Sequence, residues 1–127
     1  MPSQEAILLI AHGSRRKEAN DDLRTMADHL RSRLPDTLIE VAYLELTEPT
    51  IPQGARACIE AGAAKVFLLP FFLSPGIHVV QDLEEFREEF RQQWPEQEFT
   101  VCPPLGVHPH LVEILLTRLA EAKGIPA

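Results

Sequence analysis

Residues 7–17 read ILLIAHGSRRK. Four aliphatic residues and an alanine lead directly into a histidine, a glycine, a serine and three cations. A short, continuously apolar run is typical of a strand that is buried on both faces of a sheet. A helix is expected next, over about 16–34, with Ser14 as its N-cap and Pro35 as its stop. Its apolar residues recur at helical spacing: Ala19, Leu23, Met26, Ala27, Leu30 and Leu34.

The alternation of strand and helix then repeats three times. After the first strand at 6–11, further strands are expected at 37–44, 65–69 and 99–102. Further helices are expected at 51–61, 80–94 and 111–122. Four such units in succession predict an α/β fold, with one four-stranded parallel sheet flanked by helices on both faces, in a single domain over 1–127. Right-handed crossovers favour the strand order 2-1-3-4.

Composition excludes several classes of partner. Hydrophobic residues make up 45% of the chain and charged residues 24%, which is a globular balance. A net charge of -7 argues against attraction to nucleic acid or to an anionic membrane. No apolar run approaches the roughly 20 residues of a membrane span, and no signal peptide is recognisable at the N-terminus. We therefore expect a cytoplasmic protein whose two cysteines, Cys58 and Cys102, are reduced thiols.

Three residues that can bind metal follow three successive predicted strands. His12 follows the first strand, Glu45 the second, and His78 lies in the loop after the third. Ligands of such sheets bind at the carboxyl ends of the strands, so these side chains are expected at one edge, where Gly13 allows a sharp turn. Two neutral imidazoles and a carboxylate suit Zn²⁺, Co²⁺, Fe²⁺ or Ni²⁺ with open positions. The alternative is a hydrogen-bonded structural histidine and a solvated glutamate.

Two further features of these loops favour an anionic, flat ligand. Arg15, Arg16 and Lys17 form the densest positive patch of an acidic protein, at a helix start where anions are favoured. Phe71 and Phe72 could form an apolar wall for an organic ligand. The alternatives are a solvated cationic face and two ordinary core residues.

Four stretches together resemble a known family: LLIAHGSRRKEAND, YLELTEPTIPQG, VFLLPFFLSPGIHVVQDL and PPLGVHPHLVEILLTRL. They resemble the short-form sirohydrochlorin chelatases of the CbiX type, which are class II tetrapyrrole chelatases related to the sirohydrochlorin ferrochelatases. The resemblance covers about residues 6–120. Its specific part is the pairing of AHGSR with a downstream SPGxHV, since each piece alone is a weak signal.

The resemblance implies a homodimeric lyase that inserts a metal, usually Co²⁺, into sirohydrochlorin on the anaerobic route to cobalamin. It implies that His12 and His78 hold the metal, that Glu45 assists them as a third catalytic residue, and that no organic cofactor takes part. The residues expected to contact the tetrapyrrole are Ser14, Arg15, Arg16, Phe71, Phe72, Leu73, Ser74 and Gly76.

This chemistry agrees with the residue types. Insertion removes two pyrrole N–H protons and moves a metal into a ring of four nitrogens, so the protein must bind metal loosely. Neutral histidine and ionised glutamate can bind the metal or accept the protons. The sequence does not assign which histidine is ligand and which is base.

Other functions stay open at this point. Iron or nickel could replace cobalt, because affinities for such a site follow the Irving–Williams order. A non-catalytic metal carrier could use the same three residues without an apolar wall. A phosphohydrolase with a strand-end histidine nucleophile is disfavoured, because Ala11 stands where the arginine of the R-H-G signature of histidine phosphatases would be.

Overall fold

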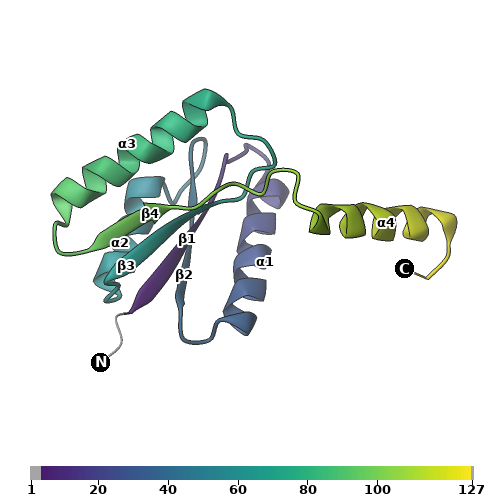
Figure 1. The fold of residues 1–127 in the computed structure, drawn as a ribbon, viewed down its shortest axis with the longest axis horizontal. Helices are drawn as coiled ribbons and strands as arrows, with labels where there is room; N and C mark the ends of the chain where they lie inside the picture. Colours follow the sequence, from purple (N-terminus) through teal and green to yellow (C-terminus); the bar gives the residue numbers. More distant parts are fainter. Residues whose placement is uncertain (1–3, 127) are drawn as a thin grey trace.

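Strands and helices alternate along the chain in the computed structural model, which describes residues 4–126 (Figure 1). The elements are β1 (Glu5–Ala11), α1 (Lys17–Arg33), β2 (Leu38–Tyr43), α2 (Ile51–Glu60), β3 (Lys65–Pro70), α3 (Ile77–Gln93), β4 (Glu98–Val101) and α4 (His110–Lys123). Each corresponds to an element expected from the sequence, with differences of a few residues at the ends.

The four strands form one parallel sheet in the order β2-β1-β3-β4, which confirms the expected α/β fold and its 2-1-3-4 order. β1 lies inside the sheet, and its Leu8 and Ile10 are completely buried, as its continuous apolar run predicted. Ala11 pairs with Tyr43 of β2, and Ile10 pairs with Pro70 of β3. The carboxyl ends of these three strands therefore meet at the same edge of the sheet.

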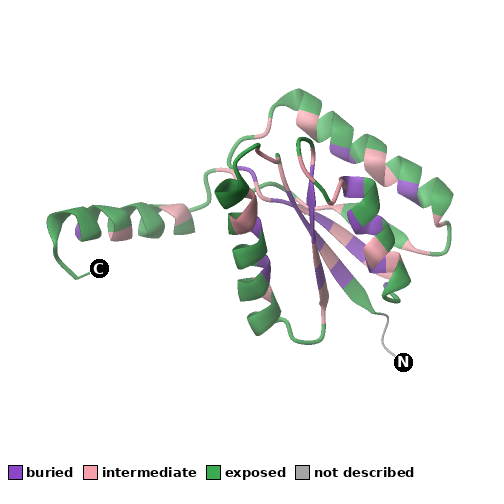
Figure 2. Ribbon diagram, turned by 180° about the vertical axis from the view of Figure 1, so that it is seen from behind, coloured by how far each residue is buried: buried purple, intermediate pink, exposed green. Residues whose placement is uncertain are grey.

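Helices pack on both faces of the sheet (Figure 1). On one face, Leu23 and Ala27 of α1 pack against Leu9 and Val41. On the other face, α2 and α3 cover a larger core that includes Leu8, Ile10, Leu68, Leu83 and Phe90. Figure 2 shows the buried positions gathered on the sheet and on the inner sides of these three helices. This distribution follows from right-handed crossovers, which place α1 opposite α2 and α3.

The starts of two helices differ from expectation. Ser14 is not the N-cap of α1, as the sequence suggested; the N-cap is Arg16, which forms no capping side-chain bond. The Ser14 hydroxyl instead accepts a 3.0 Å hydrogen bond from the Arg16 amide, because the Ser14 backbone is held by another residue, Asn20, before the helix begins. α3 begins at Ile77, so His78 belongs to its first turn and not to the preceding loop.

The last helix, α4, extends away from the sheet (Figure 1). Its bounds agree with the expected apolar helix, and Gly124 ends it in a left-handed conformation. Most of its apolar residues are nevertheless exposed (Figure 2), with exposed fractions of 68% for Leu115 and 52% for Leu116. Within the described range, no helix, α4 included, combines the length and the apolarity that a membrane crossing requires.

Candidate functional site

The backbone brings His12 and Glu45 together at the carboxyl edge of the sheet. Pairing of β1 with β2 continues beyond both strands, since the Leu44 amide donates to Ala11 O and the Glu45 amide donates to His12 O, each at 2.9 Å. Gly13 makes this approach possible: its φ is +92°, and a Cβ atom there would lie 1.9 Å from the Glu45 carbonyl oxygen. The expected proximity of His12 and Glu45 is thus built into the main chain.

The His12 ring rests on an aromatic support. It meets Phe72 edge-on, with ring centroids 4.7 Å apart and an interplanar angle of 70°. Phe72 is 7% exposed and belongs to the core beneath α2 and α3, whereas His12 and Glu45 are exposed. Packing therefore limits how the imidazole can turn, while the ring stays accessible from solvent.

His78 lies on a different element. It is exposed in the first turn of α3, six residues after Phe72 in the sequence. Among residues 4–126, no three His, Cys, Asp or Glu side chains lie close enough together to hold a metal ion. The structure thus joins His12 to Glu45 and His12 to Phe72, but it does not gather His12, Glu45 and His78 into a three-ligand group.

The expected apolar wall divides between two sides of the sheet. Phe72 is a core residue, and Phe71 is half-buried on the α1 side, where its amide donates a 2.7 Å hydrogen bond to Ile10 O. Phe71 lines an apolar groove of about 180 Å³ together with Met26, Leu30 and residues of the β4–α4 connection.

The exposed part of the β3–α3 connection begins after the two phenylalanines. Ser74 and Gly76 are exposed, and Leu73 is 61% exposed. Ile77, which the sequence analysis did not select, is 70% exposed beside His78. The sequence could have indicated Ile77, because it stands between Gly76 and the predicted metal ligand His78. Leu73 and Ile77 therefore present more apolar surface to solvent than Phe72 does.

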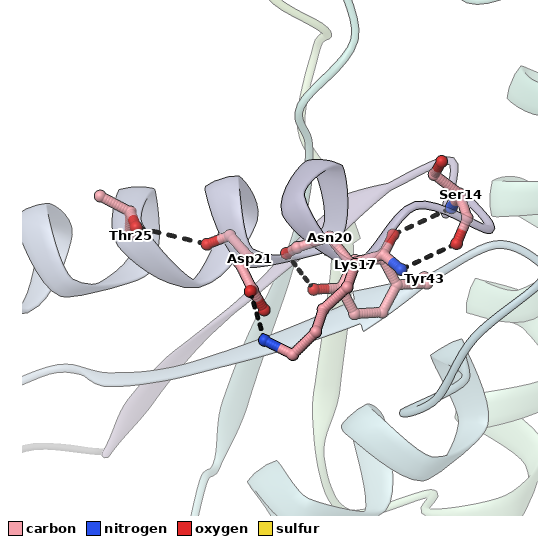
Figure 3. A network of polar contacts seen from close by, with 6 residues as sticks. All are labelled: Ser14, Lys17, Asn20, Asp21, Thr25 and Tyr43. Atoms are coloured by element: carbon pink, nitrogen blue, oxygen red, sulfur yellow. Dashed lines mark hydrogen bonds and ion pairs between the residues drawn. The ribbon is translucent and has the colours of Figure 1, made fainter.

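The loop that carries His12 is fixed by a residue that the sequence analysis missed, Asn20 of α1 (Figure 3). Its Oδ1 accepts a 2.9 Å hydrogen bond from the Ser14 amide, and its Nδ2 donates a 2.8 Å bond to Ser14 O. The Tyr43 hydroxyl donates a 2.6 Å bond to Asn20 O. Burial raises the pKa of Tyr43, while the Arg24 guanidinium opposes that rise. The hydroxyl therefore stays protonated and able to donate at neutral pH.

The expected anion-binding residues separate in the structure. Arg15 and Lys17 line a pocket of about 480 Å³ together with Ser14 and Thr47. Arg16 does not line it and serves as the N-cap residue of α1. The pocket also contains Arg24, which lies about two turns beyond Lys17 along α1, a place that gave no obvious sign in the sequence.

Comparison with known proteins places the chain in a family. The sequence model described as CbiX matches residues 6–122. This chain belongs to the CbiX family. Among CbiX relatives, a "Sirohydrochlorin ferrochelatase" of Priestia megaterium is 35% identical, over 92% of this chain and 44% of that protein. A "Sirohydrochlorin cobaltochelatase" of Methanopyrus kandleri is 26% identical, over 94% of this chain and 97% of that protein.

Solved structures support the same grouping. The crystal structure of the sirohydrochlorin chelatase SirB from Bacillus subtilis subspecies spizizenii, in complex with cobalt, superposes with a TM-score of 0.85 at 27% identity. The match covers 93% of this chain and 50% of that one. This CbiX-family chain thus spans about half the length of the Priestia and Bacillus proteins, but nearly the whole of the Methanopyrus protein.

Proposed function

We propose that this chain inserts a divalent metal ion, Co²⁺, into sirohydrochlorin. The observation that carries the proposal is the pairing of His12 with Glu45 at the open edge of the sheet, in a chain of the CbiX family. Cobalt is favoured because the Methanopyrus relative, which matches this chain over nearly its whole length, bears the name cobaltochelatase. In this proposal the product enters the anaerobic route to cobalamin.

His12 and His78 act as metal ligands in this proposal. A neutral imidazole binds Co²⁺ well enough to deliver it, but less firmly than a thiolate site would, so the nitrogens of the macrocycle can displace it. Phe72 supports the His12 ring from the core side, which directs the rest of the imidazole toward solvent and an incoming macrocycle. The metal is substrate here, since it leaves with the product.

Glu45 supplies the charge and basicity that insertion needs. Two pyrrole N–H protons must leave as the metal enters the ring, and an ionised carboxylate beside His12 can accept a proton or balance the metal charge. The Glu45 amide is bonded to His12 O, so the two side chains start from neighbouring points of the same edge. His12 or His78 can take the second proton once it has released the metal.

The functional unit in this proposal is a homodimer, because one chain offers only one wall to a flat macrocycle. α4 carries exposed apolar residues that would stay in water in an isolated chain: Val112, Ile114, Leu115, Leu116 and Leu119. The groove beside α1, lined by Leu9, Met26, Leu69 and Phe71, is an apolar surface of the same chain. The 14 residues of α4 extend about 21 Å, which is long enough to reach across a second copy.

Burial of these side chains provides the driving force for pairing. Removing one large aliphatic side chain from water contributes about 1.5–3 kcal/mol, so a few such residues can offset the entropic cost of association. We therefore assign the exposed face of α4 to the partner copy, with the closed cleft between the two sheet edges as the place for the tetrapyrrole.

Ferrochelation is the second candidate, and the 35% identical Priestia relative favours it. The test incubates the purified protein anaerobically with sirohydrochlorin and equal concentrations of Co²⁺, Fe²⁺ or Ni²⁺, and follows the absorption of the macrocycle. The proposal expects insertion faster than in protein-free controls, with Co²⁺ the fastest. Fastest insertion of Fe²⁺ would establish the second candidate. Binding of metal without any acceleration would identify a carrier and refute both.

A further inference from the structure

The pocket lined by Arg15, Lys17 and Arg24, called the cationic pocket below, lies beside the candidate site. It is placed between two of the loops that form the site. Its walls come from the β1–α1 loop, the first two turns of α1 and the β2–α2 loop. Ser14 in its lining lies two residues after His12, and Leu46 directly follows Glu45. At about 480 Å³ the pocket can admit a short carboxylated side chain together with water.

The pocket concentrates positive charge on a protein of net charge -7. Arg15, Lys17 and Arg24 line it, against a single acid, Asp21. Lys17 pairs with Asp21 at 2.6 Å, but the two side chains are 85% and 46% exposed, so this ion pair contributes little to stability. The ion pairs found among residues 4–126 include neither Arg15 nor Arg24. Both guanidinium groups are therefore open to an external anion.

The backbone around the pocket is held in place before any ligand arrives. Asn20 lines the pocket and clamps both polar groups of the Ser14 backbone, while the Tyr43 hydroxyl bonds Asn20 O (Figure 3). Lys17, Asp21 and Arg24 fall on the same face of α1, because residues three to four apart are neighbours on a helix. Arg24 is thus presented toward the loop that carries His12 by a rigid element.

We propose that this pocket binds an acetate or propionate side chain of the tetrapyrrole, with Arg24 as a specificity-determining residue and Arg15 as its partner. The inference rests on the proposed function and adds to it the residue that selects polycarboxylated macrocycles. Guanidinium groups bind carboxylates through two parallel N–H···O bonds, which fixes the orientation of the ligand as well as its charge. A macrocycle anchored in this way would have its ring held next to His12 and Glu45.

The test measures binding of metal-free sirohydrochlorin by fluorescence quenching, so that it does not depend on insertion. Arg24→Gln is compared with Arg33→Gln, an equal loss of charge in the last turn of α1. Loss of one charged hydrogen-bonding group in a partly exposed pocket raises Kd about tenfold. We expect this rise for Arg24→Gln and almost none for Arg33→Gln. The methyl ester of the macrocycle should bind both variants and the wild type equally.

Asp21→Asn gives an independent, opposite expectation. Removal of this carboxylate deletes the one group of the pocket that repels an anionic ligand, and it releases Lys17. The Kd for unesterified sirohydrochlorin should therefore fall. Equal Kd values for Arg24→Gln and Arg33→Gln, with melting curves that show both variants folded, would overturn the inference but leave the proposed function intact. If the wild type failed to bind sirohydrochlorin at all, the proposed function itself would be refuted.

Discussion

The amide of Glu45 donates a 2.9 Å hydrogen bond to the carbonyl oxygen of His12. This bond extends the β1–β2 pairing past the ends of both strands, so two candidate catalytic residues from loops far apart in sequence are linked through the main chain. Gly13 occupies the point of closest approach, with φ +92°. The relationship gives the site its stiffness and makes Gly13 its most vulnerable residue.

Gly13→Ala should destabilise the protein strongly. The new Cβ would lie 1.9 Å from Glu45 O, and the backbone conformation is left-handed. The left-handed conformation alone costs about 1–2 kcal/mol, and displacement of the Glu45 carbonyl adds to this. Urea denaturation measures the change in free energy of unfolding.

Gly62→Ala separates strain from collision in that experiment. Gly62 has a similar φ of +100°, but an added Cβ would meet nothing within 4 Å. The free energy of unfolding of Gly62→Ala should therefore fall only by the cost of the left-handed backbone conformation. Equal losses for the two variants would show that the contact between Gly13 and Glu45 is not the constraint described above.

Tyr43→Phe should cost about 1 kcal/mol of stability, the usual net value of one neutral hydrogen bond. The variant removes the donor of the 2.6 Å bond to Asn20 O while it keeps the buried ring. Because Asn20 holds Ser14, we also expect faster amide hydrogen exchange in the loop at 12–16. A stability loss without any change in exchange of that loop would show that Tyr43 does not support it.

Stability should fall as the pH rises above 9. Burial raises the pKa of the Cys58 thiol from 9.0 to about 12, so the unfolded chain loses this proton at a lower pH than the folded chain does. The stabilisation that this pKa difference gives the folded chain is present in full below pH 9 and is lost as the pH rises toward about 12. Cys58→Ala should flatten the dependence of unfolding free energy on pH between 9 and 11. An unchanged slope would contradict the argument.

Leu115→Glu should convert the proposed dimer into monomers. The substitution places a charge at the centre of the exposed apolar face of α4, where Leu115 is 68% exposed. Lys123→Gln, in the last turn of the same helix, changes the net charge by the same amount and should leave the dimer intact. Sedimentation velocity distinguishes the two states. A wild-type protein that sediments as a monomer would refute the dimer.

The strands, their order and most helix ends follow from local patterns in the sequence. The apolar run before His12 indicated a buried strand, and Thr50 caps α2 through a capping box with Gln53, a contact between residues three apart in the sequence. Neither pattern depends on distant residues.

What could not be predicted depends on tertiary contacts. The clamp between Asn20 and Ser14 displaced the N-cap of α1 to Arg16, and no helix-start rule contains that contact. Phe71 and Phe72 are adjacent in sequence, but β-type alternation sends them to opposite faces of the sheet. The helical spacing of apolar residues predicted the apolar face of α4, but this spacing does not indicate which surface covers that face.

The rate of Co²⁺ insertion into sirohydrochlorin by His12→Ala, beside the wild type and His29→Ala, tests the central claim most directly. His29 is exposed on α1 and has no part in the site, so its variant controls for the loss of an imidazole. The account predicts that His12→Ala lowers kcat/KM about 100-fold or more, in line with the loss of a ligand and base, while metal-free sirohydrochlorin still binds. A His12→Ala protein that inserts Co²⁺ at the wild-type rate would contradict it.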